Sequence, residues 1–109
     1  MNDLFDRRNH LERAFELYDA QNPEIWELFI RFTGQAMSRG YKHYSVNGIF
    51  ERIRWHTSVE ALPASGDPRV EDRDLKINNN YRPYYARKFH EQFPQHDGFF
   101  RTRVLRAAL

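Results

Sequence analysis

The stretch NPEIWELFIRFTGQAMSRG, residues 22–40, constrains the fold more than any other part of the chain. Asn22 is a residue type that caps helices, Pro23 suits the first helical turn because its missing N–H has no partner there, and Gly40 permits a left-handed exit. Between these ends, apolar side chains recur at helical spacing on a wide stripe: Ile25, Trp26, Leu28, Phe29, Ile30, Phe32, Ala36 and Met37. A stripe this wide predicts a deeply buried helix around which the rest of the chain packs.

The chain is long enough for one core around that helix. It has 109 residues, and a compact domain typically takes about 100 to 150. Aromatic residues make up 16% and charged residues 29%, which is typical of a globular protein with bulky core side chains. The chain has no cysteine, which excludes disulfides, a thiol nucleophile and Cys-based zinc sites. No apolar run approaches the roughly 20 residues of a membrane span, so we expect a cytoplasmic protein with no membrane partner.

Two further helices are predicted in the N-terminal half. The first covers residues 3–20, and its apolar side chains at helical spacing are Leu4, Leu11, Phe15 and Tyr18. After a short extended bridge at residues 42–44, Ser45 is expected to cap a helix that frays near His56 and Thr57. The inward stripe of that helix consists of Val46, Ile49, Phe50 and Ile53.

Residues 58–74 have the composition of a loop. They contain Pro63, Gly66 and Pro68 among scattered charges. A loop of this length is unusual in a compact domain and is more often functional than incidental. Residues 74–77 alternate between polar and apolar side chains, which predicts a brief strand after the loop.

The stretch KINNNYRPYYARKFHEQFP, residues 76–94, predicts a helix over residues 80–93. Asn80 is expected to cap it, Pro83 falls in the first turn where amides lack partners, and Pro94 ends it. The predicted inward stripe consists of Tyr85, Ala86, Phe89 and Phe93.

A turn and a strand are predicted after this helix. Asp97 and Gly98 are a turn signal. In FFRTRVL, apolar and basic side chains then alternate, with Phe100, Thr102 and Val104 on one side and Arg101 and Arg103 on the other. This pattern is typical of a strand with one basic face.

The order of these elements is that of a winged helix-turn-helix domain without a clear second wing strand. The predicted fold is α+β but mostly α, with an extra N-terminal helix and a small β element. Residues 1–22 form the N-terminal helix, packed on or extending from the core. Residues 23–109 form the winged-helix-like domain with its long loop at 58–74.

Charge is divided unevenly along the chain and indicates a nucleic-acid partner. Residues 1–38 hold four arginines and seven acids, net −3, whereas residues 75–109 hold seven Lys/Arg and two acids, net +5. In a winged helix the residue 80–93 helix would read the major groove and the following strand would grip the backbone. The predicted outward face of the helix carries Asn80, Tyr84, Arg87, Lys88 and Glu91, with Arg82 flanking the first turn. The predicted DNA-contacting residues are Asn80, Arg82, Tyr84, Arg87, Lys88, Arg101, Arg103 and Arg106.

Each of these residues also has an ordinary structural explanation. The asparagines at 78–80 suit a turn and cap, and tyrosines are more often packed rings with a wet hydroxyl than contacts to nucleotides. Arg87 and Lys88 are equally compatible with a solvated helix face, and Arg101 and Arg103 with the charged guard of an edge strand. Their shared position at the basic end of the chain favours the DNA hypothesis.

Catalytic and metal patterns are weak. The five histidines, at 10, 43, 56, 90 and 96, show no HxxxH or HExxH spacing, so neither a metal site nor another cofactor is predicted. Asp74-Leu75-Lys76 matches the acid-x-Lys end of a nuclease core, but one such triplet arises readily by chance among fifteen acids. The chain has no Gly-rich phosphate loop and no GxSxG, so an enzyme is not predicted.

Three segments resemble a group of small bacteriophage and prophage proteins. These segments are FERIRWHTSVE (50–60), KINNNYRPYYARKF (76–89) and GFFRTRVL (98–105). The resemblance covers roughly residues 23–105 and implies a phage-encoded protein that acts in the cytoplasm of a bacterial host. It carries no established activity, and the loop at 61–73 is longer than the resemblance leads one to expect.

The sequence therefore predicts a small phage-type regulator that binds double-stranded DNA. The alternative from another class is a phage-encoded inhibitor that binds a host defence or transcription complex through the same surface. The sequence leaves open the DNA sequence or protein partner and whether the chain forms a homodimer.

Overall fold

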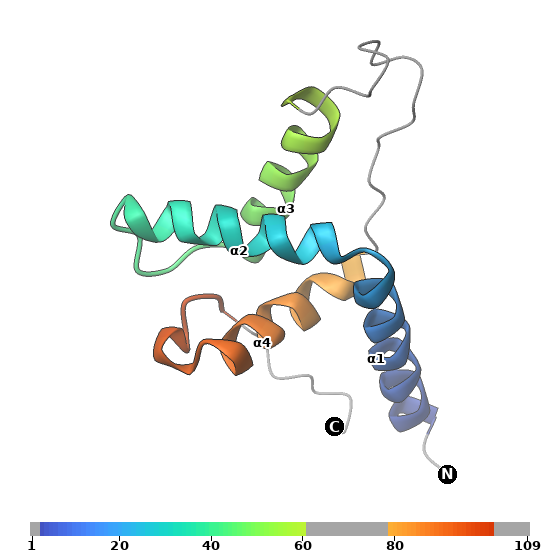
Figure 1. The fold of residues 1–109 in the computed structure, drawn as a ribbon. Coiled ribbons are helices and arrows are strands. Elements are labelled where there is room, and N and C mark those ends of the chain that lie inside the picture. The colour runs from blue at the N-terminus through green and yellow to red at the C-terminus, as the bar shows by residue number, and fades with distance from the viewer. Residues whose placement is uncertain (1–2, 61–78, 102–109) are drawn as a thin grey trace.

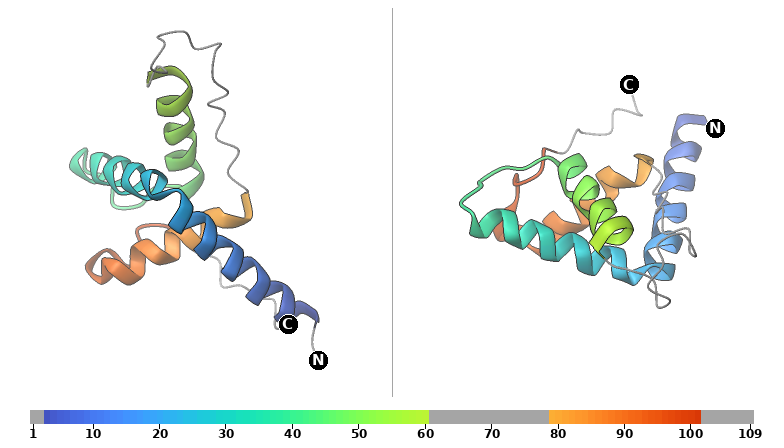
Figure 2. Two further views of the ribbon diagram at one scale, coloured as in Figure 1. Left: turned by 45° about the vertical axis from the view of Figure 1, so that its right-hand side comes forward. Right: turned by 90° about the horizontal axis from the view of Figure 1, so that it is seen from above.

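The computed structural model describes residues 3–60 and 79–101, with side chains from His10 onward. Four α-helices make up most of the described chain: α1 (Asp3–Gln21), α2 (Pro23–Ser38), α3 (Val46–Trp55) and α4 (Arg82–Gln92). Short helical turns lie at His56–Glu60, Asn79–Tyr81 and Pro94–His96. Figure 1 shows α2 passing between α3 and α4, while α1 turns away from the N-terminal end of α2; Figure 2 shows the same arrangement from two further sides.

The fold is all-helical over the described residues, which corrects part of the α+β prediction. Phe99, Phe100 and Arg101 are not in a strand. Both phenylalanines are buried, at 5% and 1% exposed, so their side chains do not alternate between core and solvent. The predicted strand at 74–77 and the remainder of the strand at 102–105 lie outside the described residues.

The centre of the core is Phe29 on α2, as the wide apolar stripe predicts. Its side chain is fully buried, and its ring lies 5.5 Å from that of Phe50 on α3 and 5.9 Å from that of Tyr85 on α4. The ring of Phe100 packs on it at 5.3 Å. Aromatic rings from four separate segments therefore meet around one helix, and ring pairs in such contacts add to the free energy of burial.

The ends of α2 differ in part from the prediction. Asn22 occupies the N-cap position of α2, as predicted, but its side chain makes no capping bond: the amide donates instead to the carbonyl oxygen of Tyr18 at the end of α1 (2.9 Å). The glycine exit is confirmed, since Gly40 has φ 95° and its N–H donates to the Met37 carbonyl oxygen. Helix α1 ends at Gln21 and α2 begins at Pro23, so the two helices meet at the sharp elbow that Figure 1 shows.

The predicted cap of α3 is confirmed, but its end is different. Ser45 Oγ accepts a hydrogen bond from the Gly48 N–H at 3.3 Å. Instead of fraying at His56, the chain continues as one wider π-helical turn to Glu60. The hydroxyls of Thr57 and Ser58 both donate to the Arg54 carbonyl oxygen, at 3.1 and 2.6 Å, which satisfies a carbonyl group at the helix end.

Helix α4 starts later than predicted and ends as predicted. Asn79–Tyr81 form a single tighter turn, so Tyr81 rather than Asn80 occupies the N-cap position of α4. Pro83 lies in the first turn, and Pro94 follows the end of the helix at Gln92. The inward positions Tyr85, Ala86 and Phe89 are buried, as expected.

Helix α1 is fixed to the body of the protein by aromatic contacts. Phe15 is 7% exposed. Its ring packs on three tyrosines of α4 and the turn before it: Tyr81 at 6.1 Å, Tyr84 at 5.4 Å and Tyr85 at 4.8 Å. The N-terminal helix thus covers one side of α4.

Candidate nucleic-acid interface

The docking of α1 removes much of the predicted DNA-contacting face of α4. Tyr84, expected to point outward, is 7% exposed and stacks on Phe15, so that prediction is wrong. Lys88 forms an ion pair with Asp19 of α1, and its ammonium group lies 4.3 Å from the centre of the Trp26 ring. Binding of a phosphate to this ammonium group would have to compete with the Asp19 carboxylate.

Arg82 is also occupied within the protein. Its side chain is 13% exposed, donates to Asn47 Oδ1 of α3 at 3.0 Å and lies 3.8 Å from the Glu51 carboxylate. Its guanidinium group covers the ring of Phe50 at 5.4 Å. The arginine therefore joins α4 to α3.

The other predicted contacts fall in three different places. Arg87 is half-buried, with its guanidinium group 5.4 Å from the centre of the Tyr84 ring, and Glu91 is exposed. Asn80 is exposed in the turn before α4, and Arg101 is exposed after the buried Phe100. Arg103 and Arg106 lie outside the described residues. The structure does not gather these side chains on one outward face of α4.

A different cationic surface lies at the far end of α2, where the chain turns from α2 into α3. Here the segment Arg39–Ser45 is exposed throughout and presents Arg39, Tyr41, Lys42, His43 and Tyr44. We call these five residues, together with Arg101, the basic edge.

Backbone contacts hold the two parts of the basic edge together. The Tyr44 N–H donates to the Phe99 carbonyl oxygen at 3.1 Å, and His43 Nδ1 lies 3.2 Å from the Gly98 carbonyl oxygen. Gly98 has φ 85°, a conformation that glycine adopts without strain. It lies in the turn that brings Phe99 alongside Tyr44. Arg101 follows Phe99 by two residues, so it lies within about 7 Å of the contact along the chain.

The charges of the basic edge are not neutralised locally. Within residues 3–60 and 79–101, none of Arg39, Lys42 and Arg101 forms an ion pair with a carboxylate. Residues 28–50 contain no Asp or Glu, and Asp97 of the adjoining turn borders the same surface hollow as Lys42 and His43. Unpaired surface cations of this kind attract polyanions over distances of about a Debye length.

A groove lies beside the basic edge, between the C-terminal half of α2 and the start of α3. It has a volume of about 490 Å³, and its walls include Phe32, Gln35, Arg39, Tyr41, Tyr44 and Arg52. We call it the tyrosine groove, because Tyr41 and Tyr44 are 55% and 36% exposed and meet edge to face at 5.2 Å.

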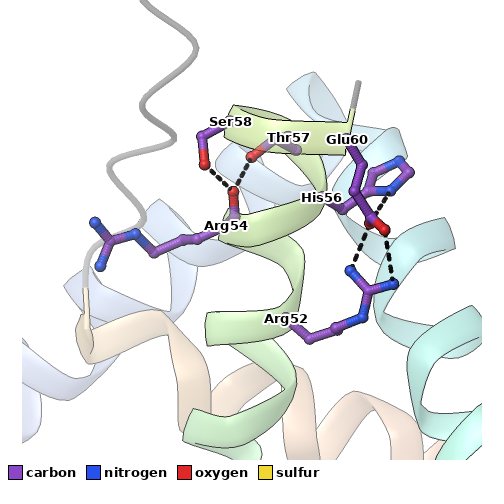
Figure 3. Close-up of polar contacts among 6 residues, drawn as sticks. All are labelled: Arg52, Arg54, His56, Thr57, Ser58 and Glu60. Atoms are coloured by element: carbon purple, nitrogen blue, oxygen red, sulfur yellow. Dashed lines mark hydrogen bonds and ion pairs between the residues drawn. The ribbon is translucent and has the colours of Figure 1, made fainter. Parts of the chain in front are cut away.

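One cation of the tyrosine groove is held by a carboxylate. Figure 3 shows Glu60 folding back from the π-helical turn onto Arg52 and His56. Arg52 donates to Glu60 Oε1 at 2.7 Å, while its guanidinium group covers the Phe32 ring at 4.3 Å. The hydrogen bond from Arg52 lowers the pKa of the Glu60 carboxyl group below its usual value; desolvation opposes this shift and His56 adds to it. Arg52 is thus fixed in direction at the rim of the groove.

One feature of the sequence indicates the basic edge, although it matches no known motif. Tyr41, Lys42 and His43 lie in the acid-free interval between Glu27 and Glu51, directly after a helix-ending glycine. An exposed loop that carries aromatic and cationic side chains in such an interval is a candidate contact surface.

No metal centre or membrane span is found in the described chain. Within residues 3–60 and 79–101, no group of three or more His, Asp or Glu side chains is placed to bind a metal ion. Among the described helices, none combines the length and the apolar character that crossing a bilayer requires.

Over residues 3–60 and 79–101, the chain forms a helical globule of four α-helices with a cationic, tyrosine-bearing edge. The sequence matches no protein-family model, and neither the search of characterised proteins nor the search of solved structures gives a match.

Proposed function

We propose that this protein is a DNA-binding protein that contacts DNA through the basic edge and acts as a regulator of phage or host genes. The observation that carries the proposal is that Arg39, Lys42 and Arg101 are exposed and have no carboxylate partner among the described residues, next to two exposed tyrosines. Lysine and arginine side chains bind phosphates, and tyrosine contributes hydroxyl and ring contacts.

The geometry supports the basic edge over α4 as the contact surface. A recognition helix must present its side chains to the groove of the duplex, whereas Tyr84 and Lys88 of α4 are engaged with α1. Releasing them would expose Phe15 and break the ion pair with Asp19. The basic edge requires no such rearrangement.

A winged-helix fold remains part of the proposal. Helices α2, α3 and α4 follow in the order that such a domain requires. The strands predicted at 74–77 and 102–105, and with them Arg103 and Arg106, lie outside the described residues.

Salt-dependent DNA binding tests the proposal. Labelled DNA of mixed sequence, as duplex and as single strand, is titrated with the protein between about 50 and 200 mM salt. Affinity should fall steeply with salt because phosphate-bound counterions are displaced. The double variant Arg39→Ala/Lys42→Ala should weaken binding to all sequences and reduce the salt slope by about two.

Arg87→Ala is the matched control, since it removes a cation from α4 without breaking an ion pair in the described residues. Its affinity should equal that of the unmodified protein. If Arg87→Ala lost affinity for DNA and the double variant did not, the contact would lie on α4 instead. Absence of binding to either DNA form at low salt would end the proposal.

One observation favours a protein partner as the second candidate. Trp55 and Val59 are 57% and 48% exposed, four residues apart near the end of α3. Exposed aromatic anchors are typical of protein interfaces. An inhibitor of a host complex would bind its partner stoichiometrically and show no DNA binding in the titration described above.

A further inference from the structure

The two tyrosines of the basic edge are placed to stack on a planar ligand. Their rings lie at 83° to one another with centroids 5.2 Å apart, so each leaves part of its surface facing the groove or solvent. The groove volume of about 490 Å³ falls in the range of roughly 300 to 1,000 Å³ of small-molecule sites. A planar ring system of modest size therefore has room to enter beside them.

Gly48 allows the Tyr44 ring to occupy its position. A Cβ atom added to Gly48 would lie 2.9 Å from Cε2 of Tyr44, closer than such atoms approach in practice. The first turn of α3 thus has a glycine where the ring of Tyr44 lies against it. The ring is consequently supported from one side while 36% of the residue stays exposed.

Polar groups at the groove rim suit the edges and the phosphate of a nucleotide. Gln35 is exposed at the groove, and its side-chain amide can donate to and accept from a base edge. Arg39 borders the same groove and forms no ion pair in the described residues. Lys42 follows the groove residue Tyr41 in the chain. Arg52 at the opposite rim is fixed by Glu60 and Phe32.

We propose that the tyrosine groove binds an unstacked base of single-stranded DNA, with the adjoining phosphates on Arg39 and Lys42. Base-paired DNA does not fit this site, because its bases are stacked inside the duplex and cannot stack on an exposed tyrosine ring. A single strand presents base faces that stack on tyrosine whatever the sequence. This inference rests on the proposed DNA-binding function and specifies the form of DNA that is preferred.

Comparison of single-stranded and duplex DNA tests the inference. Fluorescence anisotropy of a labelled oligothymidylate and of a duplex of equal length is measured with the unmodified protein, Tyr41→Ala and Tyr44→Ala. The single strand should bind more tightly than the duplex. Each alanine variant should weaken single-strand binding by roughly fivefold or more and duplex binding by much less, because a duplex can lose a tyrosine contact to its backbone but no base stacked on the ring.

Two variants control for structure and for aromatic character in general. Tyr44→Phe keeps the ring and should retain affinity for the single strand. Trp55→Ala removes an exposed aromatic residue that does not border the groove and should have no effect. Circular dichroism confirms that each variant is folded, and the more exposed Tyr41 provides the test if Tyr44→Ala fails to fold.

The outcomes separate this inference from the proposed function. Duplex binding as tight as single-strand binding, with no effect of either tyrosine variant, would overturn the inference and leave DNA binding intact. Binding of neither DNA form would overturn both.

Discussion

At the scale of single residues, Gly48 and Gly34 make an informative pair. Both are helical glycines, but a Cβ at Gly34 would meet nothing within 4 Å, whereas one at Gly48 would collide with Tyr44. Alanine in a helix interior is favoured over glycine by roughly 0.5 to 1 kcal/mol. The local cost or gain of the same substitution is thus set by one neighbouring ring.

We expect Gly34→Ala to raise the free energy of unfolding by about 0.5 to 1 kcal/mol and to leave DNA binding unchanged. Gly48→Ala should gain less stability than that, because the Tyr44 ring must move, and it should weaken single-strand binding. Chemical denaturation and anisotropy titration of the two variants measure both quantities. Equal gains in stability, with affinity unaltered in both, would show that Gly48 does not support the ring.

Residue by residue, the sequence predicted inward positions better than outward ones. Tyr85 and Phe89 were correctly assigned to the core because they share the 3.6-residue period with other apolar side chains. Tyr84 was wrongly assigned to the outward face. Periodicity identifies one buried face of a helix, but α4 is covered on a second side by α1, and nothing local in the sequence specifies where α1 docks.

At the scale of elements, the attachment of α1 depends on few contacts. Phe15 is buried among tyrosine rings of α4 and the turn before it, whereas Leu17, two residues later, is 61% exposed. Phe15 therefore contributes to the docking of α1, and Leu17 does not.

Phe15→Ala should reduce the free energy of unfolding by about 3 kcal/mol, because it removes a buried ring and leaves a cavity against the tyrosines. Leu17→Ala is the matched control on the same helix and should change stability by no more than about 0.5 kcal/mol. Urea unfolding followed by circular dichroism provides the comparison. Similar values for both variants would mean that α1 does not pack as the structure has it.

The elements themselves were largely predictable, with one instructive exception. Proline, glycine and serine at helix ends, combined with apolar periodicity, located all four helices to within a few residues. The strand expected from FFRTRVL fails over residues 99–101. Two adjacent phenylalanines both turn into the core there, and the Phe100 N–H donates to His90 Nε2 at 3.2 Å instead of to a neighbouring strand. Tertiary burial overrides an alternating pattern of this length.

At the scale of the whole molecule, this hydrogen bond makes stability depend on pH. His90 Nε2 must be unprotonated to accept it, and Nδ1 lies 3.9 Å from the Asp97 carboxylate. Burial lowers the pKa of His90 below its usual value, and Asp97 opposes that shift without cancelling it. The folded protein thus binds a proton less readily at His90 than the unfolded chain does.

Stability should therefore be complete above about pH 7 and should fall as pH decreases through the usual histidine range near 6.5, since the unfolded state then binds more protons. Urea midpoints at about pH 7.5 and 5.5 measure the loss. His90→Gln, whose amide oxygen can accept the same hydrogen bond, should show a smaller loss over that interval. An identical pH dependence in both proteins would assign the effect to other groups.

The distribution of charge over the whole molecule has a consequence for how it meets a charged ligand. Four exposed glutamates lie on the second half of α1 and the first half of α2, namely Glu12, Glu16, Glu24 and Glu27, whereas the basic edge begins where α2 ends. Arg39 follows Glu27 by 12 residues, about 18 Å of helix, which is more than twice the screening distance of about 8 Å at physiological ionic strength. At that separation the glutamates weaken the attraction of the basic edge for an anion only slightly. A polyanion of the proposed kind would therefore be drawn to the end of the molecule that carries the tyrosines before the two surfaces touch.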